Sequence, residues 1–174
     1  MPQLFVVILL LIVSSCQTKP KQEASATSSA EDSTAILARR PGPDDPRSAA
    51  DRLIRALYFE HNKKENPLLE TKDRALIDQF FVKSTADLIW RDASTSPGKL
   101  KRAKTNPLFN APNETIKKMW VLPAVVAGSR AVVYVTFERS TKPEEIRIDM
   151  EQVGGRWRIT DMLYPDGKRL SQLL

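Results

Sequence analysis

The stretch Arg130–Tyr164 reads RAVVYVTFERSTKPEEIRIDMEQVGGRWRITDMLY, and it is the part of the chain patterned to make a β-sheet. Successive side chains of a strand point to opposite faces, so every second residue shares a face. The first segment places apolar or uncharged residues on both faces, namely Val133, Val135 and Phe137 on one and Val132, Tyr134 and Thr136 on the other. Strands of this kind are buried on both sides, which predicts a central strand.

The next two segments alternate between apolar and charged residues, which indicates strands with one buried and one solvated face. The buried set is Ile146, Ile148 and Met150 in one segment and Trp157 and Ile159 in the other. The turn residues Ser140–Pro143 separate the first two segments, and Gly154-Gly155 can take the positive φ of a tight hairpin. The order therefore predicts an antiparallel meander.

The chain between Ser48 and Trp90 has helical spacing. Ser48 with Asp51 can form a capping box, Thr71 can cap a second helix, and Ser84 with Asp87 can begin a third. The residues of the three stripes are Ala50, Leu53, Ile54, Leu57, Tyr58 and His61, then Leu76, Ile77, Phe80 and Phe81, then Leu88, Ile89 and Trp90. We expect these helices to lie on the sheet.

The remaining parts complete an α+β domain over residues 48–174. Residues 93–113 are polar and predict a loop that Leu108-Phe109 anchors, and residues 115–127 read as a strand that Pro123 places at an edge or a bulge. The predicted fold is two or three N-terminal helices packed on a four-stranded, twisted antiparallel sheet, with a short C-terminal helix after Pro165.

The first residues predict a lipoprotein signal peptide over residues 1–15. The apolar run Leu4–Val13 is about half the 20 residues of a membrane-spanning helix. The small residues Ser14 and Ser15 precede the single cysteine, Cys16, and this pattern resembles the lipobox of bacterial lipoprotein precursors. The resemblance implies that Cys16 is lipidated and begins the mature protein. The segment before Leu4 lacks the expected Lys or Arg, and an ordinary secretory signal followed by a free thiol is the alternative.

The resemblance also bears on location. Many lipoproteins kept in the inner membrane carry Asp after the lipidated cysteine, whereas this chain has Gln17. The resemblance, with Gln17 at this position, therefore implies a protein of the outer membrane that faces the periplasm. Residues 16–47 are rich in Ser, Thr, Ala, Pro and charge, which predicts a disordered tether after the lipidated cysteine. A tether of about thirty residues has a root-mean-square span of about 30 Å.

Asp161 is the most informative polar residue, because strict alternation puts it on the apolar face with Trp157 and Ile159. Either the carboxylate is partly buried or a bulge turns it outward. His61 and Tyr58 lie on the stripe of the first helix and, with Asp161, are the candidates for lining a pocket. For all three we favour a structural role, since an isolated His or Asp without a second catalytic group at a telling spacing indicates no mechanism.

The formal net charge of +6 suits an acidic partner. The candidate basic patch lies in the polar loop and consists of Lys99, Lys101, Arg102 and Lys104. In the envelope its counterpart would be an anionic polymer or lipid, not nucleic acid, although such clusters are usually solvated surface. One cysteine and one histidine cannot supply a usual zinc cluster, and the chain has no glycine-rich phosphate loop. We predict no cofactor, no metal and no catalytic residue.

Four segments carry a further resemblance: Ala56-Leu57-Tyr58, residues 80–89, Thr105-Asn106-Pro107-Leu108, and residues 155–164 with Leu170. With the predicted order of helices and strands, they resemble the nuclear transport factor 2-like, or cystatin-like, α+β cone, and more narrowly an uncharacterised family of bacterial envelope lipoproteins of the YbjP type. The resemblance covers nearly all of residues 48–174. It implies the fold and an envelope setting, but no agreed activity.

These observations lead to one main hypothesis and two alternatives. The main hypothesis is a lipid-anchored, non-enzymatic domain that binds an envelope protein or polymer. The first alternative is a small-ligand-binding or weakly catalytic cone that uses Asp161 and Tyr58, and it requires a polar pocket between the first helix and the sheet. The second is an immunity-type inhibitor of a cell-wall-degrading toxin.

Overall fold

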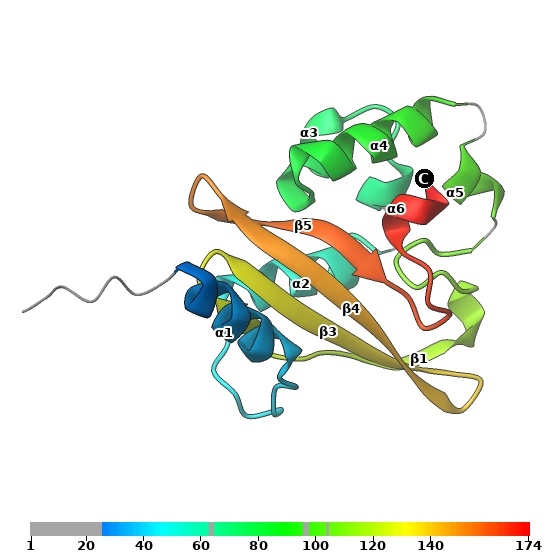
Figure 1. Ribbon diagram of the computed structural model, residues 1–174. Helices are drawn as coiled ribbons and strands as arrows, with labels where there is room; N and C mark the ends of the chain where they lie inside the picture. The colour runs from blue at the N-terminus through cyan, green and yellow to red at the C-terminus, as the bar shows by residue number, and fades with distance from the viewer. Residues whose placement is uncertain (1–25, 63–64, 96–97, 104) are drawn as a thin grey trace, which may run out of the picture.

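The computed structural model describes residues 26–62, 65–95, 98–103 and 105–174. Figure 1 shows helices gathered around one twisted sheet. The helices are α1 (Ala26–Ala38), α2 (Ala49–Phe59), α3 (Arg74–Phe80), α4 (Lys83–Ser94), α5 (Lys99–Arg102) and α6 (Leu170–Leu173), with 3-10 turns η1 (Pro67–Leu69) and η2 (Asn113–Thr115). The strands are β1 (Ile116–Val121), β2 (Val125–Ala127), β3 (Arg130–Arg139), β4 (Lys142–Val153) and β5 (Arg156–Leu163). The predicted α+β class is confirmed.

The strands β3, β4 and β5 form an antiparallel meander, as predicted. On the other side of β3, β1 pairs with its second half and β2 pairs with its first residues. The sheet has five strands instead of the expected four, because the edge segment around Pro123 is split into β1 and β2. Positive φ angles at Ser140 and Thr141, and at Gly154 and Gly155, close the two hairpins.

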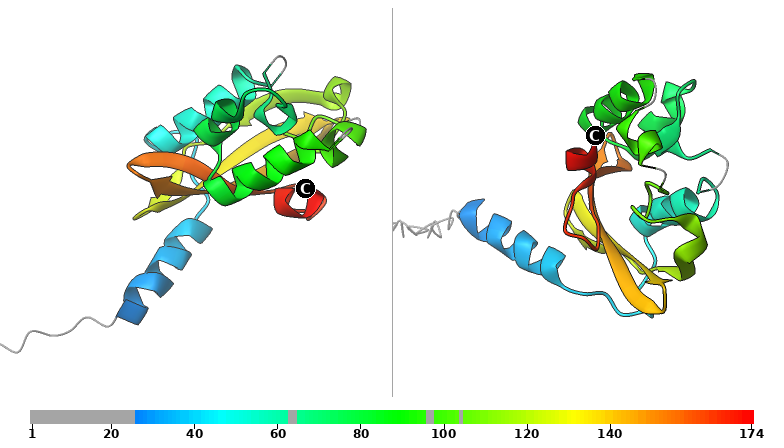
Figure 2. Two further views of the ribbon diagram at one scale, coloured as in Figure 1. Left: turned by 90° about the horizontal axis from the view of Figure 1, so that it is seen from above. Right: turned by 90° about the vertical axis from the view of Figure 1, so that its right-hand side faces the viewer.

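The helix α2 lies on one face of the sheet, while α3 and α4 lie alongside the edge strand β5 (Figures 1 and 2). The helix α2 starts with the predicted capping box of Ser48 and Asp51. The other two predicted starts are wrong. The side chain of Asp73, not Thr71, caps α3 by accepting from the amide of Ala75. The helix α4 begins at Lys83, one residue before the predicted Ser84, and has no side-chain cap. Several polar residues compete for each helix start, and their order in the sequence does not reveal which side chain reaches an amide.

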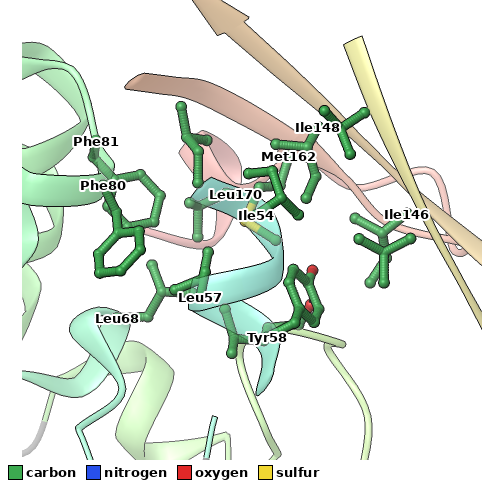
Figure 3. Packing of buried hydrophobic residues seen from close by; sticks show 14 of the residues in the cluster. Ile54, Leu57, Tyr58, Leu68, Phe80, Phe81, Ile146, Ile148, Met162 and Leu170 are labelled. Carbon is green, nitrogen blue, oxygen red and sulfur yellow. The ribbon is translucent and has the colours of Figure 1, made fainter. Parts of the chain in front are cut away.

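The core fills the space between these helices and the sheet. Figure 3 shows aromatic and aliphatic side chains from α2, η1, α3 and the strands meeting there. Ile54, Leu57, Phe80, Ile146 and Ile148 are completely buried. This packing occupies the place where the ligand-binding or catalytic alternative requires a polar pocket. The anchor Leu108-Phe109 is also buried, as predicted.

The opposite face of the sheet carries α1, in a segment for which we predicted disorder (Figure 2). Leu37 is buried there in a small cluster with Ala127, Val132 and Tyr134. Beyond the helix, the guanidinium of Arg40 pairs with Glu145 and lies 5.3 Å from the centre of the Tyr134 ring. The composition of residues 26–47 conceals this helix, because its main apolar anchor, Leu37, finds its partners about a hundred residues further along the chain.

The predicted signal peptide, Cys16 and the first part of the predicted tether lie outside the described residues. Among the helices that the structure describes, none has both the length and the apolar character needed to cross a membrane.

Candidate functional site

Asp161 lies on the outer face of the sheet, because β5 contains a bulge. Met150 pairs with Ile159, whereas the preceding residue of β4, Asp149, pairs with Asp161, so Thr160 is the extra residue. Thr160 is held through its side chain and its main chain: its hydroxyl donates to the carbonyl of Asp149, and its own carbonyl accepts from the hydroxyl of Thr85 on α4. The structure has the predicted bulge, and the Asp161 side chain is also partly buried, with 17% of its surface exposed.

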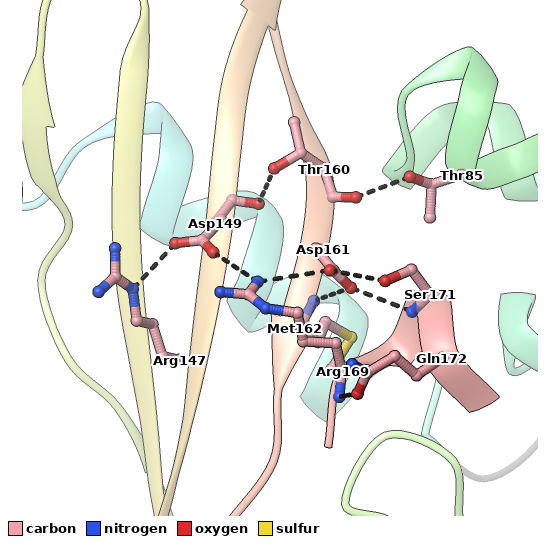
Figure 4. Close-up of polar contacts among 9 residues, drawn as sticks. All are labelled: Thr85, Arg147, Asp149, Thr160, Asp161, Met162, Arg169, Ser171 and Gln172. Carbon is pink, nitrogen blue, oxygen red and sulfur yellow. Dashed lines mark hydrogen bonds and ion pairs between the residues drawn. The ribbon is translucent and has the colours of Figure 1, made fainter. Parts of the chain in front are cut away.

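Figure 4 shows Asp161 and Asp149 side by side with Arg169 between them. The Nη1 of Arg169 lies 3.3 Å from Oδ2 of Asp149 and 3.4 Å from Oδ2 of Asp161. Asp161 also accepts from the amide and the hydroxyl of Ser171, and Arg147 donates to Asp149. The hydrogen bond to Asp149 is the largest reason that the pKa of Arg169 is raised. The network therefore fastens the C-terminal segment to β4 and β5.

Tyr58 is buried, and its hydroxyl donates to the carbonyl of Leu108 at 2.8 Å. Tyr164 does the same at the neighbouring residue, donating to the carbonyl of Pro107 at 2.6 Å. Burial raises the pKa of both hydroxyls well above the usual value for tyrosine. Both tyrosines thus hold the loop before β1 on the core. The sequence analysis did not connect either of them with this loop.

His61 lies at the end of α2, with its ring edge-on to Phe80 at 5.1 Å between centroids. Its Nδ1 is 3.7 Å from Oε2 of Glu65. His61 and Tyr58 therefore contact core residues beside α2, whereas Asp161 contacts Arg169 and Ser171 of the C-terminal segment.

The predicted basic loop is partly helical, since Lys99–Arg102 form α5. The carboxylate of the buried Asp92 accepts from the amides of Lys99 and Leu100 and so holds the start of this short helix. The Nζ of Lys99 donates to the main-chain oxygen of Leu174, while Lys101 is exposed. Lys104 and the side chain of Arg102 lie outside what the structure describes.

A larger surface feature lies at the tip of the β4–β5 hairpin. A hollow of about 700 Å³ opens between α2, α3 and the start of β5, and its apolar lining includes Leu53, Ala75 and Trp157. A second hollow of about 320 Å³ shares Asp78 and Arg158 with the first. We call the two together the hairpin groove. The other residues lining it are Ala49, Gln79, Gly155, Arg156, Arg74, Phe81, Val82, Lys83 and Val153.

The hairpin groove is basic. Its lining has four basic side chains and one acidic side chain, Asp78. Arg74 and Lys83 share the carboxylate of Asp87, and Arg74 also contacts Asp78. In contrast, Arg156 and Arg158 have no carboxylate within ion-pair distance among the residues that the structure describes. The Nη1 of Arg158 donates to the carbonyl of Trp157 instead.

This groove is not predicted from the sequence, where the alternation of β5 indicates only that Arg156 and Arg158 are solvated. The basic–aromatic–basic run Arg156-Trp157-Arg158 beside a hairpin is the sequence signal that could have indicated a binding surface. The other wall of the groove comes from α2 and α3, which are far away in the sequence. Within the described residues there is no group of three His, Cys, Asp or Glu side chains that could hold a metal ion.

Comparisons with known proteins give little further information. No protein-family model matches the chain, and no curated protein matches it. Among solved structures, the chain is similar to a chain in the crystal structure of the type VI native effector–immunity complex Tae3–Tai3 from Ralstonia pickettii. The two share 18% sequence identity at a TM-score of 0.44, over 67% of this chain and 93% of that chain. A likeness at this level supports no conclusion about the role of this chain.

Proposed function

We propose that this chain is a non-enzymatic domain that binds a protein of the bacterial envelope and is held at the membrane by a lipid on Cys16. One observation carries the binding role: the polar groups that could perform chemistry are engaged in holding the fold, while two arginines at the hairpin groove have no acidic partner within the described residues. Tyr58, Tyr164 and Asp161 each bond a loop or the C-terminal segment.

The packing of the interior supports binding over catalysis. A catalytic cone needs room for a substrate beside its polar groups. Here Leu57 and Phe80 fill the space between α2 and the sheet, and the Tyr58 hydroxyl is already bonded inside it. The charge and the apolar patches of this domain face solvent instead, at the hairpin groove and at Trp120 and Val126, which are half exposed.

The anchor rests on the sequence alone, on the apolar run of the signal peptide and on the small residues before Cys16. It is tested by fractionating cells that produce the full chain or its Cys16→Ser variant. Loss of the variant from the membrane fraction is the expected result. A Cys16→Ser protein that stays with membranes, even after a high-salt wash, would show that a lipid on this residue is not the anchor.

The binding role is tested by crosslinking the full chain in its native envelope and identifying what is purified with it. The expected result is one protein recovered reproducibly with the wild-type chain and not with a matched lipoprotein that carries the same first residues and an unrelated domain. Recovery of polymer alone, or of nothing beyond that control, would overturn the proposal. If the recovered protein is a cell-wall hydrolase, adding the purified domain to it tests the immunity-type alternative directly.

A further inference from the structure

The hairpin groove is built largely from regular secondary structure. Its walls come from α2, α3 and the β4–β5 hairpin, and its floor includes Leu53 and Ala75 beside the half-buried Trp157. The hollow continues past Asp78 and Arg158 to Phe81 and to Val153, a valine whose side chain is 51% exposed. A long, open hollow of this kind fits an extended chain better than a compact small molecule.

The charge of the groove indicates what kind of chain would fit. The two carboxylates of Asp78 and Asp87 offset the charges of Arg74 and Lys83. Within the described residues, the unpaired positive charge of the groove therefore comes from Arg156 and Arg158, on either side of Trp157. Guanidinium groups bind carboxylates with two parallel hydrogen bonds, a planar geometry that the ammonium of lysine does not offer. An occupant with carboxylates flanking an apolar residue complements this arrangement.

The edge of β5 adds a third observation. At Ile159 this edge is covered, because the amide of Val82 donates to the Ile159 carbonyl at 3.0 Å. Towards the hairpin, no loop amide or carbonyl in the described chain bonds residues 156–158 on that side, and the Trp157 carbonyl accepts from the side chain of Arg158. A short open strand edge can accept an added strand, with main-chain bonds for affinity and side-chain contacts for specificity.

We propose that the hairpin groove binds an extended acidic segment of the protein partner, which pairs its carboxylates with Arg156 and Arg158 and places an apolar side chain on Trp157. This inference rests on the proposed function, since it names the chemistry of the partner and the surface that receives it. The occupant is a segment with alternating acidic and apolar residues, because alternation in a strand puts carboxylates and apolar groups on separate faces.

The test uses the full-length, membrane-targeted chain with a photo-crosslinking amino acid in place of Gln79, an exposed residue of the groove wall. Crosslinked peptides are identified by mass spectrometry. A matched chain carries the same amino acid in place of Lys117, which is exposed at the opposite end of the sheet. The expected result is a crosslink from position 79, but not from position 117, to a protein segment rich in Asp or Glu.

The charge contacts are tested in the same chain with Arg156→Glu and Arg158→Glu together. The matched control is Lys117→Glu with Lys142→Glu, two exposed residues at the other end of the sheet that change the net charge equally. We expect the groove variant to reduce the crosslink about tenfold or more and the control to leave it within about twofold, since like charges placed face to face oppose docking. Circular dichroism spectra of both variants serve to check that they fold.

Two groups of results separate the inference from the proposed function. Three results overturn the groove assignment and leave the binding role standing. They are a partner captured by the whole chain without a crosslink from position 79, an equal loss of the crosslink in the control variant, and a crosslinked segment that contains no carboxylates. A crosslink to lipid, to polymer or to a second copy of this chain also overturns this assignment. If the whole chain captures no protein at all, the proposed function itself fails.

Discussion

The interior beneath α2 and the groove at the β4–β5 hairpin lie on the same sheet, but they differ in whether their polar side chains have bonding partners. In the interior, the Tyr58 hydroxyl has a bonding partner and apolar side chains fill the surrounding space. At the groove, Arg156 and Arg158 lack acidic partners in the part of the chain that the structure describes, and Trp157 is only half buried. Satisfied polar groups indicate a role in stability, whereas basic groups beside an exposed apolar surface indicate a place for a partner.

The same contrast separates two arginines. Arg169 lies between Asp149 and Asp161, two carboxylates on directly opposed strand residues. Arg158 lies on the same strand as Asp161, and among the described residues its guanidinium has the carbonyl of Trp157 as acceptor and no carboxylate. We therefore expect substitutions in the interior and at Arg169 to change stability, and substitutions at the groove to change binding.

The largest effect on stability is expected for Phe80→Ala. Phe80 is completely buried at the centre of the core, so truncation removes apolar burial and leaves a cavity. The free energy of unfolding should fall by about 3–5 kcal/mol, measured by urea denaturation. As the groove counterpart, Val153→Ala should change it by less than about 0.5 kcal/mol. Equal losses in the two variants would erase the distinction between the two regions.

The substitution Tyr58→Phe should cost about 2 kcal/mol at neutral pH, because the buried Leu108 carbonyl loses its donor. Burial raises the pKa of Tyr58 in the folded chain, so the folded state keeps this proton above about pH 10 while the unfolded chain releases it. The contribution of Tyr58 to the free energy of unfolding is thus fully present below about pH 10. It is lost as the pH rises further, by up to about 1.4 kcal/mol per pH unit.

Urea titrations of the wild-type chain and of Tyr58→Phe at several alkaline pH values check this behaviour. The variant should lose stability less steeply with rising pH than the wild type, because one titrating group has been removed. Parallel curves for the two proteins would show that Tyr58 does not hold its proton in the way its burial indicates.

The substitution Arg169→Met is expected to cost about 1 kcal/mol, a value kept small because the guanidinium is 42% exposed. It leaves Asp149 opposite Asp161 without the cation between them, so the loss should grow as salt is lowered. Hydrogen exchange at Ser171 gives a local readout, since its amide donates to Asp161. Unchanged protection there would contradict the role of the network in holding the C-terminal segment.

The smallest change in stability is expected for Arg158→Met, within about 0.5 kcal/mol of the wild type, because Arg158 has no acidic partner to lose among the described residues. Thermal unfolding followed by circular dichroism is sufficient to compare it with Arg169→Met. A loss larger than that of Arg169→Met would mean that Arg158 is a structural residue.

The sequence predicted what local patterns determine. The alternation at Val133 and Ile148 placed the strands, Gly154-Gly155 placed the hairpin, and Ser48 placed the start of α2. It left the position of Asp161 open between burial and a bulge, because the bulge is held by Thr85 on a distant helix.

The same reason explains the other differences. The helix α1 depends on Leu37 reaching β2 and β3, and the hairpin groove depends on Asp78 and Arg158 meeting from separate elements. Such contacts have no signature in a local window of sequence. The lipid anchor and the resemblance to envelope lipoproteins remain predictions from the sequence, since Cys16 lies outside the described residues.

The central claim is that the groove, and not the interior, carries the function. It is tested most directly by recovering the crosslinked partner from envelopes that contain equal amounts of folded Tyr58→Phe chain or of folded chain with both Arg156→Glu and Arg158→Glu. We predict full recovery with Tyr58→Phe and a loss of about tenfold or more with the groove variant. Loss with Tyr58→Phe and full recovery with the groove variant would contradict the claim.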